Sequence, residues 1–389
     1  MTGPWHIVTG EYPPQPGGVS DYSRTVAEGL AAAGASVHVW APPAAGPSAP
    51  ETGSAVRVHR LPDLFGEASL AAMNRELDEG PRPHTLLVQY VPQAFGKRGM
   101  NLRFCRWVQH RARTPDADVR VMFHEPFFPF VAWPPHRNLL ALANRIMAVL
   151  LLSDIRVAYV STRAWERRLS RYAPRSRFFE WLPVPAAVPA EADPASVARW
   201  RALVAPAADC RVVGHFGTYG ILVTRLLEPA LESLLTAKPE VQICLVGPGS
   251  EMLAARFVGA HPECTAQVHA VGTLPAAEVS ACIRACDVML QPYADGVSGR
   301  RTTLMAALAN GVATVTTRGP ATEPEWAQDR AVVLENPRPR ALGLAVVRLL
   351  DDDSERARAA GAALAVYERR FTARNTVDRL LTGPARRKG

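Results

Sequence analysis

The sequence predicts an α/β protein of two doubly wound, Rossmann-like domains that face a common cleft. A length of 389 residues exceeds the size of one ordinary hydrophobic core, so two domains are expected. Short β-branched strands alternate with amphipathic helices in both halves, which is typical of parallel sheets covered on both faces. The proline-rich stretch 183–195 separates the halves. We therefore expect domains over 1–190 and 191–365, followed by a helix and basic tail over 366–389.

The first half begins with one βαβ unit. The strand HIVTG is followed by a polar Pro/Gly loop, a helix that ends at a left-handed cap on Gly34, and the strand SVHVWAP. Ser20 or Asp21 is expected to cap that helix at its start. Further strands are expected at 84–90, 119–124 and 156–161. Ligands are expected at the carboxyl ends of such parallel strands.

The second half repeats this pattern after the prolines. Its expected strands are contained in RVVGHFGTYG, VQICLVGPGS, QVHAVGT, DVMLQPY and VATVTT, and its expected helices in LLEPALESLLTA, AEVSACIRA and TTLMAALANG. Helical periodicity continues from Ser354, and the final ARRKG is interpreted as a frayed terminus.

Composition and charge narrow the class of protein. The apolar fraction of 48% and charged fraction of 21% are those of a globular protein, and a net charge of +8 favours an anionic ligand or surface. The longest apolar run, 146–152, is far shorter than the roughly 20 residues of a membrane-spanning helix. With no signal-like start, a cytoplasmic location is expected. The six cysteines are expected to be reduced, and Cys282 and Cys286 to be buried core residues rather than metal ligands.

The most informative segment is PYADGVSGRRTTLMAALANG, from 292 to 311. A strand is followed by a loop of small residues, including Ser298 and Gly299, and then by a short helix that Thr302 or Thr303 is expected to cap and Gly311 to close. Such a helix start presents backbone N–H groups to phosphate oxygens. Arg300 and Arg301 stand at this point, so we expect them to neutralise a diphosphate rather than to be solvated surface residues.

Two other glycine-rich turns and one histidine follow predicted strands. The turn Gly217, Thr218, Tyr219 and Gly220 lets backbone approach a ligand, but its GxxGxxG spacing and the absence of a ribose-binding acid argue against a dinucleotide site. Gly17 and Gly18 suit a tight turn or a ligand contact equally. His124, followed by Glu125, ends the strand VRVMFH where catalytic groups collect.

With these segments in place, the chain resembles the glycosyltransferase superfamily with the GT-B fold, specifically the retaining "group 1" transferases. The resemblance rests on PPQPGGVSDYSRTVAEGLAAAGASVHVWAP, VGHFGTYG, VQICLVGPGS, VHAVGTLPAAEVSACIRACDVMLQPY and LMAALANGVATVTT. It implies that Gly17 and Gly18 lie against the donor diphosphate and that His124 lies by the reacting sugar. It also implies that Gly272, Thr273 and Leu274 hold the nucleotide base, and that the final helix crosses back to the N-terminal domain.

The sequence departs from this family at its paired glutamates. Alignment on Gly311 places Ser298 and Ala306 at those positions, and Asp295 is the nearby candidate to replace the first acid. The Arg and Lys that the family carries after the first strand of the second domain are also absent, so Arg300 and Arg301 are expected to supply their charge. The chain resembles a divergent branch.

The resemblance implies metal-independent transfer of a hexose-type sugar from a nucleotide-diphosphate donor to a glycan, a lipid-linked or a small-molecule acceptor, with the C-terminal domain binding the donor. No cofactor and no nucleic acid are expected, and Asp351–Asp353 is interpreted as a solvated run. Asp21, Tyr22 and Glu125 are candidate acceptor contacts. The basic segment 97–113, with Phe104 and Trp107, suits either peripheral membrane contact or a surface helix. A GT-B nucleotide-sugar epimerase and a non-catalytic binding homologue remain alternatives.

Overall fold

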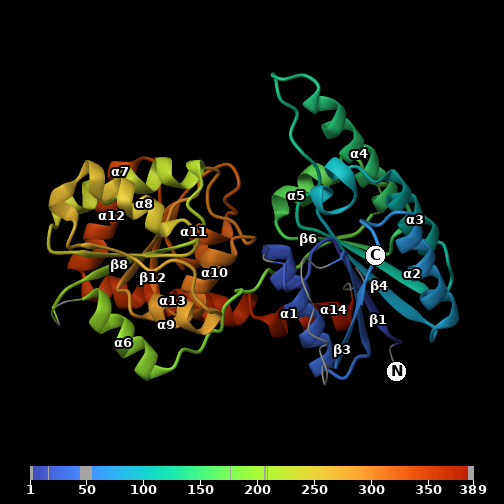
Figure 1. Ribbon diagram of the computed structural model, residues 1–389, viewed down its shortest axis with the longest axis horizontal. Coiled ribbons are helices and arrows are strands. Elements are labelled where there is room, and N and C mark those ends of the chain that lie inside the picture. The colour runs from blue at the N-terminus through green and yellow to red at the C-terminus, as the bar shows by residue number, and fades with distance from the viewer. Residues whose placement is uncertain are drawn as a thin grey trace. The chain divides into compact units, whose positions relative to one another are not determined.

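A computed structural model describes residues 3–15, 17–43, 55–175, 177–205, 207 and 209–383 of this chain (Figure 1). The chain divides into two compact units. Unit 1 comprises Met1–Pro183 and Ala373–Gly389, and unit 2 comprises Val184–Thr372. The chain therefore leaves unit 1 earlier, and returns to it later, than the sequence boundaries at 190 and 365. The basic tail 385–389 lies outside the described residues.

Unit 1 is built on one seven-stranded sheet in the order β3-β2-β1-β4-β5-β6-β7, in which all neighbouring strands are parallel. Its strands are β1 Trp5–Thr9, β2 Val37–Ala41, β3 Val56–Arg60, β4 His84–Tyr90, β5 Ala117–Phe123, β6 Val157–Val160 and β7 Phe179–Trp181. The strands expected from the sequence are confirmed. The two edge strands, β3 and β7, were not predicted, because both are short and partly polar.

Helices cover both faces of this sheet. They are α1 Gly18–Ala32, α2 Glu67–Glu79, α3 Leu102–Ala112, α4 Arg137–Asp154, α5 Arg163–Leu169 and α14 Ala373–Thr382, with 3₁₀ turns η1 Pro92–Ala94 and η2 Lys97–Gly99. One face shares a hydrophobic core with α2, α3 and α4. On the other face α14 packs against α1 and receives a hydrogen bond of 2.6 Å from Arg120 to the Leu380 carbonyl.

Unit 2 repeats the plan with a six-stranded parallel sheet in the order β10-β9-β8-β11-β12-β13. Its strands are β8 Val212–Phe216, β9 Gln242–Val246, β10 Val268–Ala270, β11 Val288–Gln291, β12 Ala313–Thr317 and β13 Val333–Glu335. Its helices are α6 Pro194–Val204, α7 Ile221–Ala237, α8 Ser250–Ala260, α9 Ala276–Arg284, α10 Thr302–Ala309, α11 Glu325–Asp329, α12 Pro339–Asp351 and α13 Asp353–Arg370, with the 3₁₀ turn η3 Pro262–Cys264. Residues of α7, α8 and α12 form its main core with the sheet. Two parallel-sheet α/β domains are thus confirmed.

Helix ends explain several boundaries and correct two expectations. The glycines expected to end α1 and α10, Gly34 and Gly311, adopt positive φ angles of 87° and 64°. The caps expected at the starts of these helices are wrong: Gly17 and Arg301 occupy the cap positions, and neither helix start has a side-chain cap. Ser20, in the first turn of α1, instead donates to the Gln15 carbonyl in the preceding loop at 2.7 Å.

Other features of the sequence have simple structural outcomes. Asp352, in the acidic run 351–353, caps α13 by accepting a hydrogen bond of 2.8 Å from the Glu355 amide. Cys282 and Cys286 are buried, and Cys244 of β9 places its Sγ atom 3.4 Å from that of Cys282. Among the described residues, no helix has the length and apolarity needed to cross a bilayer.

Candidate functional site

The carboxyl ends of β8, β9 and β10 in unit 2 are joined by backbone hydrogen bonds. The Gly217 amide donates to the Val246 carbonyl at 3.1 Å, and the Gly247 amide donates to the Gly272 carbonyl at 2.8 Å. Gly247 has a φ of 113°, and a Cβ atom on it would lie 2.2 Å from the Gly217 carbonyl oxygen. Only glycine fits there. The two segments expected to bind the donor, 217–220 and 272–274, are therefore held at one edge of the sheet.

A cavity of about 230 Å³ opens at the ends of β8 and β11, within unit 2. Its lining is His215, Phe216, Gly217, Thr218, Val223, Gln291, Pro292, Tyr293, Arg300, Arg301, Thr302 and Thr303. The structure thus brings together six residues that the sequence nominated: Gly217, Thr218, Arg300, Arg301, Thr302 and Thr303. The other donor candidates of unit 2, Tyr219, Gly220, Gly272, Thr273, Leu274, Ser298 and Gly299, are not among the residues that line it.

The two arginines form the positive wall of this cavity. Asp295 makes ion pairs with both of them, at 3.3 Å to Arg300 and closer to Arg301. The Arg301 guanidinium lies 4.6 Å from the centre of the Tyr293 ring, and Tyr293 shares a hydrogen bond of 2.9 Å with Thr303. Burial, and then the neighbouring Arg300, lower the pKa of Arg301. The cluster of three charges has a net charge of +1, which suits an anion.

The loop before α10 is held by Glu323, a residue that the sequence did not single out. Its carboxylate accepts hydrogen bonds from the Gly299 amide at 2.9 Å and from the Trp326 indole at 2.8 Å. Burial raises the pKa of Glu323. Ser298 and Ala306, which stand where the resemblance places the family's glutamates, are both fully buried. Serine and alanine carry no charge, so neither side chain replaces the family's carboxylates.

His215 and Gln291 contribute two hydrogen-bond acceptors to the lining of the cavity, and the sequence did not single out either residue. The His215 Nδ1 atom lies 2.7 Å from the Leu290 carbonyl oxygen, so Nδ1 carries the ring proton and Nε2 is an acceptor. Burial lowers the pKa of His215 to about 4, which keeps the ring neutral. The Gln291 amide nitrogen donates to the Phe216 carbonyl at 3.1 Å, which leaves Oε1 as its free end. Neither His215 Nε2 nor Gln291 Oε1 has a partner among the described residues.

In unit 1, His124 follows β5 directly and is buried. Its Nε2 atom shares a hydrogen bond of 2.8 Å with the Gln89 side-chain oxygen, and its ring meets the Tyr22 ring edge-on at 4.8 Å. Because Gln89 Oε1 can only accept, Nδ1 is the unprotonated nitrogen of His124. Burial lowers the pKa of His124 to about 3, so the ring is neutral at physiological pH. The structure brings Tyr22 and His124 together, as two of the sequence candidates.

The remaining candidates of unit 1 lie around the start of α1 and after β5. Glu11, which the sequence reasoning passed over, places its carboxylate 2.3 Å from where a Cβ atom on Gly17 would be. Burial, followed by the smaller effect of Asp21, raises the pKa of Glu11 although a backbone hydrogen bond opposes the shift. Asp21 pairs with Arg24 at 3.5 Å, Gly18 is exposed, and Glu125 is half-buried.

The basic segment 97–113 was expected to be either a membrane contact or a surface helix, and the burial of its aromatic residues bears on this choice. Phe104 and Trp107 of α3 are buried in the core of unit 1, and the Trp107 indole donates to Asn74 at 2.7 Å. They are not available to enter a membrane. The surface-helix alternative is the one that agrees with the structure, since the exposed face of α3 carries Arg103 and Arg106.

Comparison with known proteins places this geometry in a wider context. Residues 211–352 match the family model described as "Glycosyl transferases group 1". The sequence matches no curated protein. The structure is similar to that of sucrose-phosphate synthase from Thermosynechococcus elongatus, with a TM-score of 0.74, 15% identity and 98% of each chain covered.

Two further solved structures show the same likeness. Anabaena HepE in complex with UDP has a TM-score of 0.70 and 15% identity, over 97% of this chain and 98% of that one. WaaG, a glycosyltransferase involved in lipopolysaccharide biosynthesis, has a TM-score of 0.63 and 16% identity, over 98% of this chain and 100% of that one. At sequence identities this low, the structural likeness shows the fold alone. The chain therefore has the GT-B fold of two parallel-sheet α/β domains, and its residues 211–352 carry the sequence pattern of the group 1 glycosyl transferases.

Proposed function

We propose that this protein is a glycosyltransferase that takes a hexose-type sugar from a nucleoside diphosphate donor bound in unit 2. The cavity at the ends of β8 and β11 is the observation that carries this proposal, because it combines two arginines with a helix start inside the segment that matches the family model. Solved structures of HepE, which share the fold, hold UDP and UDP-glucose. We therefore favour a UDP-type donor for this chain.

The proposed donor diphosphate lies against Arg300, Arg301 and the start of α10. In the free protein Asp295 neutralises part of the arginine charge, at 3.3 Å from Arg300. A diphosphate oxygen would compete with this carboxylate for the same N–H groups, and it is the better partner for two adjacent guanidinium groups. Asp295 thereby keeps the partly buried arginines paired and in place until the donor arrives.

The acceptors in the cavity lining favour a ligand that also carries hydroxyl groups. His215 Nε2 and Gln291 Oε1 can only accept hydrogen bonds, and a deprotonated diphosphate has no proton to donate to them. Sugar or ribose hydroxyl groups do. The cavity therefore suits a phosphate joined to a polyol, as in a sugar nucleotide.

In the proposed reaction the bond between the anomeric carbon and the diphosphate oxygen breaks, and its electron pair stays on the diphosphate. Arg300, Arg301 and the α10 amides would stabilise that developing charge without a metal ion. His124 would contact the reacting sugar as a neutral hydrogen-bond partner. Gly17 and Gly18 would lie against the diphosphate, and Gly272–Leu274 would hold the nucleotide base. The acceptor would be contacted by Asp21, Tyr22 and Glu125. Retention of anomeric configuration belongs to the same proposal.

A melting-temperature screen over UDP, GDP, ADP and their sugars tests donor binding. We expect one nucleoside diphosphate to raise the melting temperature of the wild type, because it binds only the folded state. The double variant Arg300→Ala/Arg301→Ala should lose this rise and lose turnover by at least about a hundredfold. Arg358→Ala is the matched control, since Arg358 is an exposed arginine of α13 that pairs with Glu355 at 3.2 Å. An unchanged rise in the double variant would refute the assignment.

Product analysis separates the three candidate activities. Transfer predicts free nucleoside diphosphate and a glycosylated acceptor. Epimerisation predicts a changed nucleotide sugar when no acceptor is present. The buried Ser298 and Ala306, which lack the family's carboxylates, are the observation that favours a binding homologue. A raised melting temperature without either product would identify that homologue.

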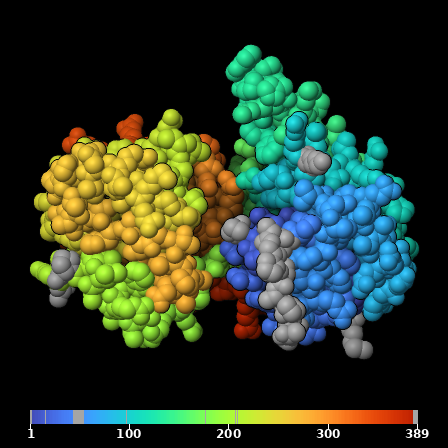
Figure 2. All heavy atoms as spheres, viewed as in Figure 1, coloured from blue at the N-terminus to red at the C-terminus, as the bar shows by residue number. Residues whose placement is uncertain are grey.

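The apolar exposed face of α4 suits membrane contact better than the segment 97–113 does. Leu139, Leu142, Ile146 and Val149 are exposed at a spacing that places them on one face of α4, and Trp133 before the helix is 81% exposed. This part of unit 1 lies at the molecular surface in Figure 2. Exposed arginines are also present on these helices, namely Arg137 of α4 and Arg163, Arg167 and Arg168 of α5. We propose that this face rests on an anionic bilayer at the cytoplasmic side.

Co-sedimentation with vesicles tests this surface. We expect binding to vesicles that contain anionic lipid, weaker binding to neutral vesicles, and at least a tenfold loss on Leu142→Gln/Ile146→Gln, on the order of magnitude expected for two apolar contacts. Leu344→Gln, an exposed leucine of α12 in unit 2, is the control. Equal binding by the double variant and the wild type would refute α4 as the contact.

A further inference from the structure

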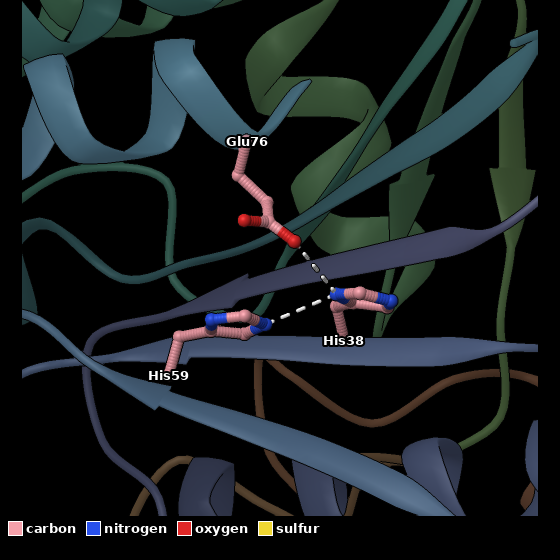
Figure 3. A group of neighbouring side chains, drawn as sticks. All are labelled: His38, His59 and Glu76. Carbon is pink, nitrogen blue, oxygen red and sulfur yellow. Dashed lines mark hydrogen bonds and ion pairs between the residues drawn. The ribbon is translucent and has the colours of Figure 1, made fainter. Parts of the chain in front are cut away.

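Two histidines and a glutamate meet on one face of the unit 1 sheet, under α2 (Figure 3). His38 lies on β2 and His59 on the neighbouring edge strand β3, while Glu76 comes from α2. The strand register pairs His38 with Arg57 and Trp40 with His59, so both histidines point to the same side. These residues are separate from the strand ends that carry His124 and from the cavity in unit 2.

Their nitrogen and oxygen atoms converge at distances close to those of a metal site. His38 Nδ1 shares a hydrogen bond of 3.0 Å with His59 Nε2 and lies 4.0 Å from Glu76 Oε1, and the three ligand atoms all lie within 4.8 Å of one another. In a tetrahedral zinc site with bonds of about 2.0–2.1 Å, neighbouring ligand atoms are about 3.3 Å apart. The spacing of the ligand atoms is therefore close to that of a zinc site. Metal binding would replace the proton that the two imidazoles share, and the half-buried Glu76 carboxylate would approach by about 1 Å.

The surroundings hold the two rings in position. The Trp40 ring stacks on the His59 ring with centroids 4.0 Å apart, and the His6 ring lies 4.8 Å from that of His38. The Trp40 indole donates to His6 Nδ1 at 3.2 Å, which fixes both of these neighbours. Rings held by packing lose little freedom when a ligand binds, so the site is preorganised.

The charges also suit a cation. Imidazole ligates a metal in its neutral form, so the two histidines add no charge to such a site. Glu76 supplies one negative charge, and Arg57, which pairs with His38 in the strand register, has an exposed side chain that can turn to solvent.

We propose that His38, His59 and Glu76 bind one Zn²⁺ ion, with water in the fourth position. Neutral imidazole and carboxylate ligands in this number suit zinc and similar borderline divalent ions. The ion would tie the edge strand β3 to β2 and to α2. The proposal does not depend on the transfer activity, because every ligand belongs to this one face of unit 1.

Titration of the full-length reduced protein with Co²⁺, followed by competition with Zn²⁺, tests the site. We expect one equivalent of Co²⁺ to give visible absorption without the near-ultraviolet band of a cobalt–thiolate bond, because Cys244 and Cys282 are the competing thiols. Glu76→Gln should weaken binding at least about tenfold, and His38→Gln/His59→Gln should abolish it. His261→Gln, which removes another histidine beside a glutamate, at 3.7 Å in unit 2, should change nothing.

Glu76 is only half-buried on α2, so Glu76→Gln keeps this test decisive even if the double histidine variant fails to fold. Melting curves recorded in chelator check that each variant is folded before metal is added. A thiolate band in the cobalt spectrum would overturn the proposal, as would equal affinity of the wild type and Glu76→Gln.

Discussion

At the residue scale, His124 and His215 have the same design in different units. Each is a buried neutral imidazole with one ring nitrogen tied to a fixed oxygen, the Gln89 side chain at 2.8 Å or the Leu290 carbonyl at 2.7 Å. His124 could be nominated from sequence because it ends a strand and precedes an acid. His215 and Gln291 could not, since they lie inside strands and their hydrogen bonds come from neighbouring strands. Glu323 was missed for a similar reason, because its partner Gly299 is distant in sequence.

Protonation of His124 provides a test at this scale. Burial lowers its pKa from 6.5 to about 3, so the unfolded chain binds the extra proton first as the pH falls. The contribution of the neutral His124 ring to the free energy of unfolding is fully present above pH 6.5 and is lost as the pH falls toward 3. At pH 5 this loss amounts to about 2 kcal/mol. We expect urea unfolding of His124→Gln to depend less on pH between 7.5 and 5 than that of the wild type. The exposed-histidine variant His110→Gln should match the wild type, and an equally steep His124→Gln profile would contradict the assignment.

At the scale of elements, the parallel strands β8 to β12 are predictable because buried β-branched runs alternate with helices. The edge strands β3, β7 and β13 are not, since their pairing partners rather than their own three to five residues determine them. The starts of α1 and α10 were also misjudged. Polar residues near a helix start predict a cap, but here Ser20 and Thr303 make other hydrogen bonds.

A pair of glycine substitutions tests how the strand ends of unit 2 are held. Gly247→Ala should destabilise the protein by more than about 1 kcal/mol and weaken nucleoside diphosphate binding, because the new Cβ would strike the Gly217 carbonyl at 2.2 Å. Gly361→Ala, at an open position in α13, should stabilise it by about 0.5–1 kcal/mol. Chemical denaturation and calorimetric titration measure both effects. Unimpaired binding by Gly247→Ala would show that this edge does not hold the donor.

At the scale of the whole molecule, two α/β domains follow from length, alternation and the proline-rich stretch. The sequence does not locate the crossings at 183 and 372, because contacts remote in sequence determine them. In unit 1, Thr376 donates to the Pro183 carbonyl at 3.0 Å and Arg379 to the Trp181 carbonyl at 3.1 Å. Only a folded structure brings such segments together.

Truncation tests the contribution of α14 to unit 1. Ending the chain at Thr372 removes the buried Val377 and Leu380 and leaves Arg120 without its Leu380 partner. We expect the free energy of unfolding of unit 1 to fall by at least about 3 kcal/mol, while that of unit 2 is unchanged. Differential scanning calorimetry should show one transition lowered and another kept. Ending the chain at Gly383 serves as the control, and an unshifted thermogram for the shorter chain would contradict this role.

The bond between Thr376 and Pro183 has a consequence for how the chain is wired. The outgoing and returning segments of the chain lie next to each other within unit 1. Unit 2 is therefore an inserted domain whose two connections to unit 1 are adjacent. Cutting the backbone once, near 184 or near 372, would give two polypeptides that stay associated through the packing of α14 in unit 1. Replacing 184–372 with the equivalent block of a protein of the same fold would need only two splice points, side by side, and would exchange the proposed donor cavity as a single cassette.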